Sequence, residues 1–319
     1  MGTLLSADAV VLERPERLAL TRLPLDAPGE DDVVVDLEWS GISTGTERLL
    51  YTGAMPEFPG MGYPLVPGYE SVGRVARAPA SGALAEGERV FVPGAACYGE
   101  VRGLFGGAAS RLVVPARRVA PLGERVGEDG VLLALAATAF HALTSGFDPR
   151  GPLPDLIVGH GVLGRLVARL CTALGGRAPT VWEQDPARHD GAVGYEVTRP
   201  EDDDRHDYSV VCDVSGDAGI LDVLMPRLAP RGEIILAGFY GPPLTFAFPP
   251  AFMKEARIRV ASEWQPEDLR AVATLVDMGR LRLDGLITHH TAARAAPEAY
   301  RTAFSDPGCL KMVLDWSAL

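Results

Sequence analysis

A glycine-rich segment in the middle of the chain has the spacing of a phosphate-binding turn. Gly159, Gly161 and Gly164 follow an apolar run at 156–158 and open an apolar helix predicted over 163–174. In this setting the first glycine permits a tight turn, the second lets the backbone approach a pyrophosphate, and the third lets the helix pack on the strand. The pattern predicts a dinucleotide-binding turn, the alternative being a glycine turn that binds nothing. The residues expected to bind the cofactor here are Gly159, His160, Gly161, Val162, Leu163 and Gly164.

An acidic residue further along the chain favours one of the two nicotinamide dinucleotides. Glu183 ends a predicted strand over 179–183, roughly 20 residues after the glycine turn, where the fingerprint places the acid that binds the ribose hydroxyls. A carboxylate there would repel a 2′-phosphate, so NAD is favoured over NADP. Arg188 is the opposing signal, since a nearby arginine can accommodate that phosphate.

The elements around this turn alternate between short β-runs and helices, which is typical of a doubly wound parallel sheet. Residues 128–267 are predicted to form this nucleotide-binding domain. Residues 1–127 are rich in Gly, Pro and short β-runs and indicate an antiparallel β domain, which 268–319 are expected to complete. The predicted strands of the nucleotide-binding domain are 155–158, 179–183, 208–213, 232–237 and 256–260, and its first helices are 131–144, 163–174 and 218–228.

Composition excludes several classes of function. A net charge of −12 offers no basic face to nucleic acid or anionic lipid. The longest apolar run, 131–143, is shorter than the roughly 20 residues that a membrane helix needs. The first residues lack the apolar stretch of a signal peptide, so a soluble, cytoplasmic protein is expected. The acidic run 201–204 is expected to be a solvated loop.

Six segments, taken in order, resemble the medium-chain dehydrogenase/reductase superfamily. The resemblance implies a GroES-like β-barrel domain beside a Rossmann-type domain, which is the fold class we predict. It also implies further cofactor contacts at Thr138, Ser215 and Gly238, and a homodimer joined through the edges of the nucleotide-domain sheets. The matching segments are 41–47, 67–75, 87–90, 138–143, 213–216 and 232–238.

The chain departs from the zinc-containing members of that superfamily. They hold a catalytic metal with a Cys in the first segment and a His in the second, where this chain has Ser43 or Thr44 and Tyr69. Hydroxyls and a phenol are poor zinc ligands compared with thiolate and imidazole. The region of the structural zinc loop, 94–110, contains only Cys97. The pair at 289–290 is more typical of exposed or strand-alternating histidines, so we predict no metal.

Alcohol oxidation without zinc needs another route for the hydroxyl proton. The candidates are the residues aligned with the lost zinc shell, Thr44, Thr46, Tyr69 and Glu70. Tyr69 is expected to hydrogen-bond the substrate oxygen, Thr46 to pass the proton towards solvent, and Glu70 to act as the orienting base. The alternatives are a packed aromatic for Tyr69 and a carboxylate that holds the loop for Glu70.

A narrower resemblance concerns the substrate. The stretches 42–50 and 58–73 are similar to a subgroup of bacteriochlorophyll synthesis that oxidises the 3-(1-hydroxyethyl) group of a (bacterio)chlorophyllide. A flat tetrapyrrole needs a broad apolar surface. The alternatives left open are an NADPH-dependent quinone or enoyl reductase, a non-catalytic nucleotide-binding protein and, for the loop itself, a small satellite core. The loop residues expected to contact the tetrapyrrole are Tyr51, Met55, Phe58, Met61 and Tyr63.

Overall fold

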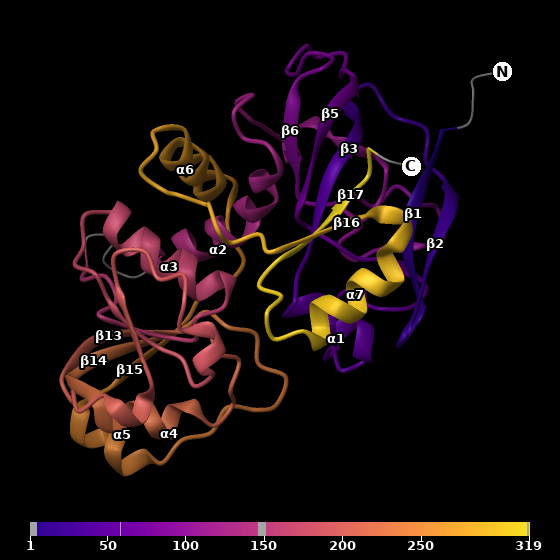
Figure 1. Cartoon of the computed structure of the whole chain (residues 1–319). Helices are drawn as coiled ribbons and strands as arrows, with labels where there is room; N and C mark the ends of the chain where they lie inside the picture. The colour runs from indigo at the N-terminus through magenta and orange to yellow at the C-terminus, as the bar shows by residue number, and fades with distance from the viewer. Residues whose placement is uncertain (1–4, 58, 146–150, 318) are drawn as a thin grey trace. The chain divides into compact units, whose positions relative to one another are not determined.

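The computed structural model describes residues 5–57, 59–145, 151–317 and 319 (Figure 1). The chain forms two compact units, Met1–Ala134 with Asp284–Leu319, and Leu135–Leu283. Both boundaries lie later than the 127/128 and 267/268 that the sequence suggests. The second differs because α6 (Pro266–Asp277) is tied to α2 (Leu133–Thr144), where His141 Nδ1 lies 2.8 Å from Asp268 Oδ2.

The Leu135–Leu283 unit, called here the sheet unit, contains a single six-stranded sheet in its described part. The strand order is β12-β11-β10-β13-β14-β15 and every neighbouring pair is parallel. This is the predicted doubly wound topology, whose order reverses beside the first strand. The strands are β10 Leu156–Val158, β11 Thr180–Trp182, β12 Glu196–Thr198, β13 Tyr208–Asp213, β14 Leu228–Leu236 and β15 Arg257–Val260.

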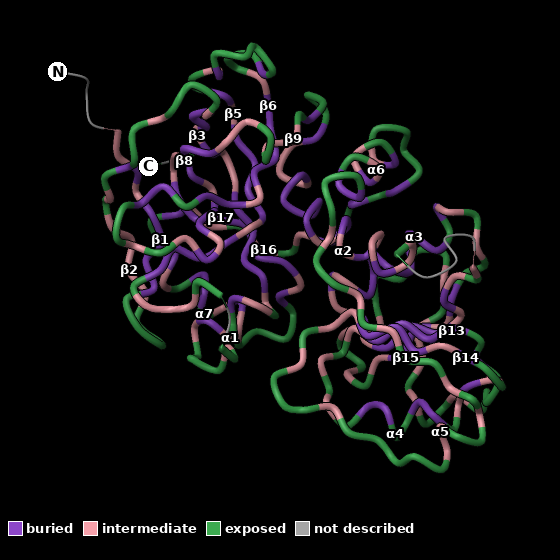
Figure 2. Tube along the Cα trace, turned by 180° about the vertical axis from the view of Figure 1, so that it is seen from behind, coloured by how far each residue is buried: buried purple, intermediate pink, exposed green. Residues whose placement is uncertain are grey.

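The helices of the sheet unit differ from prediction mainly after β13. The helix expected over 218–228 is only α4, Ile220–Leu224, because Pro226 lies in the short 3-10 turn Met225–Arg227 that follows. The strand β12 and the helix α5 (Phe248–Lys254) were not predicted. The central strand β13 is buried at all but one position, whereas α5 carries no buried residue (Figure 2). The remaining helix, α3, spans Val162–Ala173.

The other unit, called here the barrel unit, is built from two sheets. One has the order β2-β1-β4-β7, and the other runs β16-β17-β3-β5-β6-β9 with β8 paired to β3. The strand β17 pairs antiparallel with β3, so the C-terminal segment is part of the sheet that β3 begins. The strands are β1 Ser6–Arg14, β2 Arg17–Pro24, β3 Asp32–Ile42, β4 Leu65–Val66, β5 Ser71–Arg77, β6 Arg89–Val92, β7 Arg102–Gly103, β8 Arg111–Pro115, β9 Ala120–Pro121, β16 His289–Ala292 and β17 Met312–Asp315, and the α-helices are α1 Thr46–Thr52 and α7 Ala296–Ser305.

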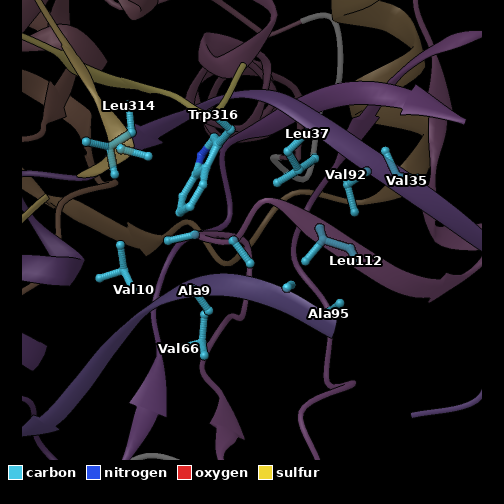
Figure 3. Close-up of a cluster of buried hydrophobic side chains, with 14 of the residues drawn as sticks. Ala9, Val10, Val35, Leu37, Val66, Val92, Ala95, Leu112, Leu314 and Trp316 are labelled. Carbon is cyan, nitrogen blue, oxygen red and sulfur yellow. The ribbon is translucent and has the colours of Figure 1, made fainter. Parts of the chain in front are cut away.

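The core of the barrel unit lies between these sheets. Val10 from β1 and Leu37 from β3 point into one cluster, together with Leu314 from β17 (Figure 3). Trp316 closes the cluster and donates its indole N–H to Ser40 Oγ at 2.9 Å. Because strands from both ends of the chain fill this core, the C-terminal segment is part of the unit's folding rather than an appendage.

Candidate functional site

The glycine turn of the sheet unit has the geometry that a dinucleotide phosphate requires. Gly159 has a φ of +103°, which favours glycine. A Cβ on Gly164 would lie 1.9 Å from the carbonyl oxygen of Gly159, so helix and strand can pack this closely only with glycine there. Around Gly161 nothing lies within 4 Å of such a Cβ, which leaves room for a phosphate group. Val162 and Leu163 form the first turn of α3, whose N–H groups are available to an anion.

The Glu183 carboxylate reaches back to this turn from the residue after β11. Its Oε2 accepts the backbone N–H of His160 and its Oε1 accepts that of Asp185, both at 3.0 Å. The side chain is half-buried, and a carboxylate oxygen can accept a second hydrogen bond. Glu183 therefore holds the turn in shape and is also placed where the fingerprint expects the ribose.

His160 is a buried, neutral connector and not an exposed contact residue. Its Nδ1 lies 2.6 Å from the carbonyl oxygen of Arg188, and its Nε2 lies 2.8 Å from the Tyr195 hydroxyl. Burial lowers the pKa of His160 to about 4, so the ring carries no charge at neutral pH. Arg165, which sequence reasoning missed, donates to the carbonyl oxygens of both His160 and Arg188. The Arg188 side chain itself is 41% exposed.

Two further predicted cofactor residues follow the neighbouring strands. Ser215 comes after β13, and its backbone lies 3.4 Å from the Cβ position of Gly159. Gly238 follows β14, and its N–H donates to the carbonyl oxygen of Asp213 at 3.1 Å. The structure thus brings Ser215 next to the glycine turn and holds Gly238 at the adjacent strand end. Thr138 lies half-buried on α2.

A second polar group lies in the barrel unit around Tyr69. The Tyr69 hydroxyl lies 2.7 Å from Ser43 Oγ, and the ring packs edge-on against Phe105 with centroids 5.3 Å apart. Burial raises the pKa of Tyr69, the charge of Glu70 raises it further, and hydrogen bonds to Ser43 and Thr46 oppose the shift. Tyr69 is therefore a neutral phenol at physiological pH. Tyr69 also hydrogen-bonds Thr46, while Thr44 is half-buried in the loop before α1.

Glu70 is fully buried and paired with a lysine that sequence reasoning missed. Lys311 Nζ lies 2.6 Å from Glu70 Oε2 and donates to the carbonyl oxygen of Ile42 at 3.2 Å. Glu70 Oε1 has no hydrogen-bond partner among the described residues. Burial raises the pKa of Glu70, and the neighbouring lysine opposes this. These contacts favour the alternative in which Glu70 holds the site together.

Glu47 and Tyr300 complete this group, and neither was predicted. Glu47 is 1% exposed and accepts the N–H of Ser43 at 3.0 Å and the hydroxyl of Tyr300 at 2.6 Å. Its pKa is raised to about 7, chiefly by burial. Because Tyr300 and Lys311 lie more than two hundred residues away in sequence, no local motif indicates that they belong here.

The apolar loop residues pack together in a small cluster. Tyr51, Met55, Met61 and Tyr63 are half-buried and contact a core of four leucines that includes Leu50. The Tyr63 hydroxyl donates to the carbonyl oxygen of Leu50 at 2.6 Å. These contacts match the satellite-core alternative for the buried part of each side chain. Phe58 lies outside the described residues.

The chemistry of the donor set does not fit a catalytic zinc. Ser43 or Thr44 is expected at the superfamily's thiolate position and Tyr69 at its imidazole position, and Ser43 and Tyr69 hydrogen-bond each other. Over the described ranges, no three His, Cys, Asp or Glu residues are grouped so as to hold a metal ion. Cys97 is buried, and burial raises its pKa to about 11.

Among the described helices, none is both long and apolar enough to span a membrane.

Known proteins resemble this chain at two levels. Residues 29–124 match the alcohol dehydrogenase GroES-like domain. The 2-desacetyl-2-hydroxyethyl bacteriochlorophyllide A dehydrogenase of Rhodobacter capsulatus is 56% identical, covering 98% of this chain and 99% of that protein. The enzyme of the same name from Cereibacter sphaeroides is 55% identical, covering 97% and 98%.

Solved structures share the fold at low sequence identity. An alcohol dehydrogenase from Escherichia coli, in complex with NADH, has a TM-score of 0.82 at 20% identity and covers 97% of this chain and 99% of its own. A dehydrogenase from Sinorhizobium meliloti, bound to NADP, has a TM-score of 0.81 at 20% identity and covers 98% and 99%. The identity of 55–56% over nearly the full length shows that the chain belongs to the medium-chain dehydrogenase/reductase family of GroES-like alcohol dehydrogenases and is an oxidoreductase acting on a CH–OH group.

Proposed function

We propose that this chain oxidises the 3-(1-hydroxyethyl) group of a (bacterio)chlorophyllide to a 3-acetyl group, with NAD as hydride acceptor and without a catalytic zinc. The observation that carries the proposal is identity of 55–56% over nearly the full length to two dehydrogenases named for a hydroxyethyl bacteriochlorophyllide. This identity is far above the 20% of the solved structure bound to NADH, and an identity that low shows the fold alone.

The sheet unit would hold the cofactor. The turn and the start of α3 fit a pyrophosphate, because Gly161 leaves open space beside the N–H groups of the first turn of the helix. Glu183 would accept the ribose hydroxyls and disfavour a 2′-phosphate, which is the basis for proposing NAD. Ser215 and Gly238 line the adjacent strand ends. When bound, the nicotinamide ring supplies the acceptor for the hydride that leaves the carbinol carbon.

The barrel unit would handle the hydroxyl proton. Tyr69 is neutral, so it can take the substrate's proton on its oxygen only as its own proton moves on to the Ser43 or Thr46 hydroxyl. Thr46 is half-buried and would pass the proton towards solvent. Glu70 would hold the site through its ion pair with Lys311 rather than act as the orienting base.

The substrate's own chemistry reduces the need for a metal. The 1-hydroxyethyl group is attached to a conjugated macrocycle, so positive charge that develops at its carbon as hydride leaves is spread over the ring. The half-buried aromatic and Met side chains of the 51–63 loop would contact the flat face of that ring.

The assembly and location are also proposals. The β15 strand is one of the two edges of the parallel sheet and carries exposed Ile258 and Val260 at 39% and 73%. An open edge with exposed apolar side chains pairs readily with another strand, which supports a homodimer joined there. A net charge of −12 supports a protein without a nucleic-acid partner, and a cytoplasmic location is part of the same proposal.

The direct test is substrate oxidation by the purified protein. NADH formation should appear with 3-(1-hydroxyethyl) tetrapyrroles and be close to absent with ethanol or butanol, which lack both the conjugation and the apolar face. Truncated substrates should lose turnover as well as affinity, because remote binding energy orients the reacting carbon. Equal rates on simple alcohols, or reduction of quinones or enones with NADPH alone, would reject the proposal.

A further inference from the structure

Glu47 is a buried carboxylate whose two direct partners are both neutral groups. Its Oε1 accepts the backbone N–H of Ser43 and its Oε2 accepts the hydroxyl of Tyr300. The lysine nearby is used by another acid, since Lys311 Nζ binds Glu70 Oε2 at 2.6 Å. A carboxylate that is buried without a cation at contact distance gains little from ionising. Glu47 can therefore exchange a proton at a pH where exposed glutamates are fully ionised.

Groups on several elements around Glu47 set the pKa of its carboxyl group. Its pKa is raised to about 7 overall, chiefly by burial, and the charge of Glu70, after β4, contributes to the rise. Lys311 before β17, the Ser43 amide and the Tyr300 hydroxyl on α7 lower it. The balance leaves the carboxyl group half-ionised close to neutral pH.

The two donors to Glu47 differ in whether they can accept a hydrogen bond when the Glu47 carboxyl group is protonated. The Ser43 amide can only donate, so Oε1 must remain an acceptor. The Tyr300 hydroxyl can turn and accept, since a hydroxyl carries both a proton and lone pairs. A proton on Glu47 therefore belongs on Oε2, where Tyr300 accommodates it.

Ser43 connects Glu47 to the phenol that meets the substrate. Its amide donates to Glu47 at 3.0 Å, and its Oγ lies 2.7 Å from the Tyr69 hydroxyl. Hydrogen bonds to an ionised acceptor are roughly twice as strong as neutral ones, so ionisation of Glu47 fixes Ser43 more firmly. We propose that Glu47 is a positioning residue whose ionised carboxylate holds Ser43, and through it the Tyr69 hydroxyl, in the orientation that receives the substrate's proton. This inference rests on the proposed function.

The test compares the pH dependence of turnover in wild type, Glu47→Gln and Glu86→Gln. Glutamine keeps an acceptor for the Ser43 amide but does not ionise, while Glu86 is an exposed glutamate in a turn of the same unit and serves as the matched control. At saturating hydroxyethyl tetrapyrrole and NAD, wild type and Glu86→Gln should gain turnover between about pH 6 and about pH 8. Glu47→Gln should lack this rise, and its turnover should stay roughly tenfold below the upper plateau. This factor corresponds to the extra strength that ionisation of Glu47 gives to its hydrogen bond with the Ser43 amide.

A second measurement reports on Glu47 without substrate. Infrared difference spectra between the same two pH values should show a protonated carboxylic acid band that disappears on raising the pH, present in wild type and absent in Glu47→Gln. Tyr300→Phe should shift this transition upwards, because the ionised form loses a donor. An unchanged band or an unchanged pH rise in Glu47→Gln would overturn the inference. If wild type oxidises no tetrapyrrole while the band behaves as expected, the proposed function fails and the proton exchange of Glu47 stands.

Discussion

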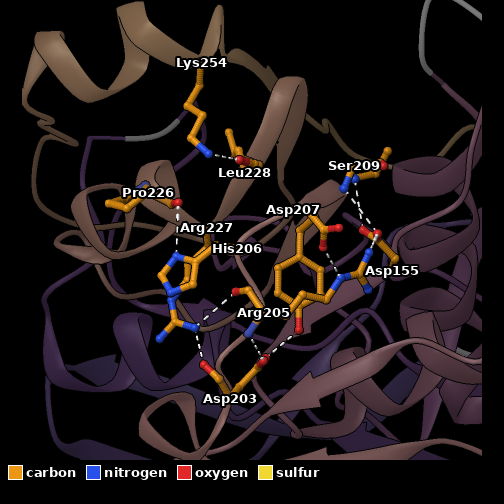
Figure 4. Close-up of polar contacts among 12 residues, drawn as sticks. Asp155, Asp203, Arg205, His206, Asp207, Ser209, Pro226, Arg227, Leu228 and Lys254 are labelled. Carbon is orange, nitrogen blue, oxygen red and sulfur yellow. Dashed lines mark hydrogen bonds and ion pairs between the residues drawn. The ribbon is translucent and has the colours of Figure 1, made fainter.

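Two of the ionic clusters among the described residues, one in each unit, differ in how their charges are compensated. In the barrel unit Lys311 and Glu70 are 1% and 0% exposed, and one carboxylate oxygen has no partner in the described structure. In the sheet unit Arg205 pairs with Asp155 at 2.6 Å and Asp207 at 2.7 Å, and these side chains are 41%, 28% and 76% exposed (Figure 4).

This difference indicates different roles: the buried Lys311–Glu70 pair holds the candidate site in the barrel unit, whereas the exposed Arg205 network joins segments of the sheet unit. Water can solvate the Arg205 network whenever a contact is lost, so each contact contributes little. Lys311 and Glu70 have no such recourse, because each would be left as an uncompensated buried charge. The barrel cluster therefore responds to small changes in charge, and it lies around the phenol that we propose carries the proton.

The largest expected effect comes from removing one half of the buried pair. Lys311→Met keeps the aliphatic stem but leaves Glu70 unpaired, which should lower the free energy of unfolding by about 3–5 kcal/mol. Arg205→Met, the exposed counterpart, should lower it by about 1 kcal/mol or less. Urea denaturation followed by circular dichroism measures both.

The double variant sharpens this comparison. Adding Glu70→Gln to Lys311→Met removes the orphaned charge, so it should recover most of the lost stability. Equal losses for Lys311→Met and Arg205→Met would show that burial does not distinguish the two clusters.

A tyrosine in each region tests where the chemistry is carried out. Tyr69→Phe should lower turnover by roughly a hundredfold or more, because the proton loses its relay, with NAD affinity unchanged. Tyr195→Phe removes the hydroxyl that meets His160 Nε2, so it should weaken NAD binding and spare turnover at saturation. Steady-state kinetics and NAD titration separate the two outcomes, and a fully active Tyr69→Phe variant would remove Tyr69 from the mechanism.

The geometry of the glycine turn could be predicted from the sequence. The polar group around Tyr69, with Glu47, Glu70 and their partners, could be predicted only in part. Gly159, Gly161 and Gly164 lie within one strand–turn–helix unit, so their spacing alone fixes their geometry. The partners of Glu47 and Glu70 come from the C-terminal segment, which only the completed sheet brings near them.

The acidic run shows the same limit on a smaller scale. Three of its residues are exposed, as expected for a solvated loop. Asp203 is half-buried and accepts hydrogen bonds from Trp182 at 2.6 Å and from the Tyr208 hydroxyl. Charge repulsion predicts that an acidic run is exposed to solvent. It does not predict which of its carboxylates will accept hydrogen bonds from neighbouring strands. The doubly wound sheet itself was confirmed, because its strands and helices follow from local periodicity.

A smaller effect is expected at Glu183. Glu183→Ala removes a charged acceptor for the ribose hydroxyls and for the two backbone N–H groups it now binds, so NAD binding should weaken at least about tenfold. NADP binding should weaken less or improve, because the repulsion of the 2′-phosphate is lost. Fluorescence titration with both cofactors measures the ratio. An equal loss for both would mean that Glu183 serves only to hold the turn.

The smallest expected effect is that of a chelator, which should leave activity unchanged. The resemblance places Ser43 or Thr44, and Tyr69, at the superfamily's ligand positions, and the oxygens of Ser43 and Tyr69 already hydrogen-bond each other. Hydroxyl and phenol oxygens bind Zn²⁺ far less readily than thiolate and imidazole, and burial raises the pKa of Tyr69, which disfavours the phenolate that a metal would need. Purified protein should therefore contain well under one equivalent of zinc, and tetrapyrrole oxidation should continue after dialysis against a strong chelator. Stoichiometric zinc by elemental analysis, with activity lost on chelation and restored by zinc, would show that the barrel cluster supports a metal after all.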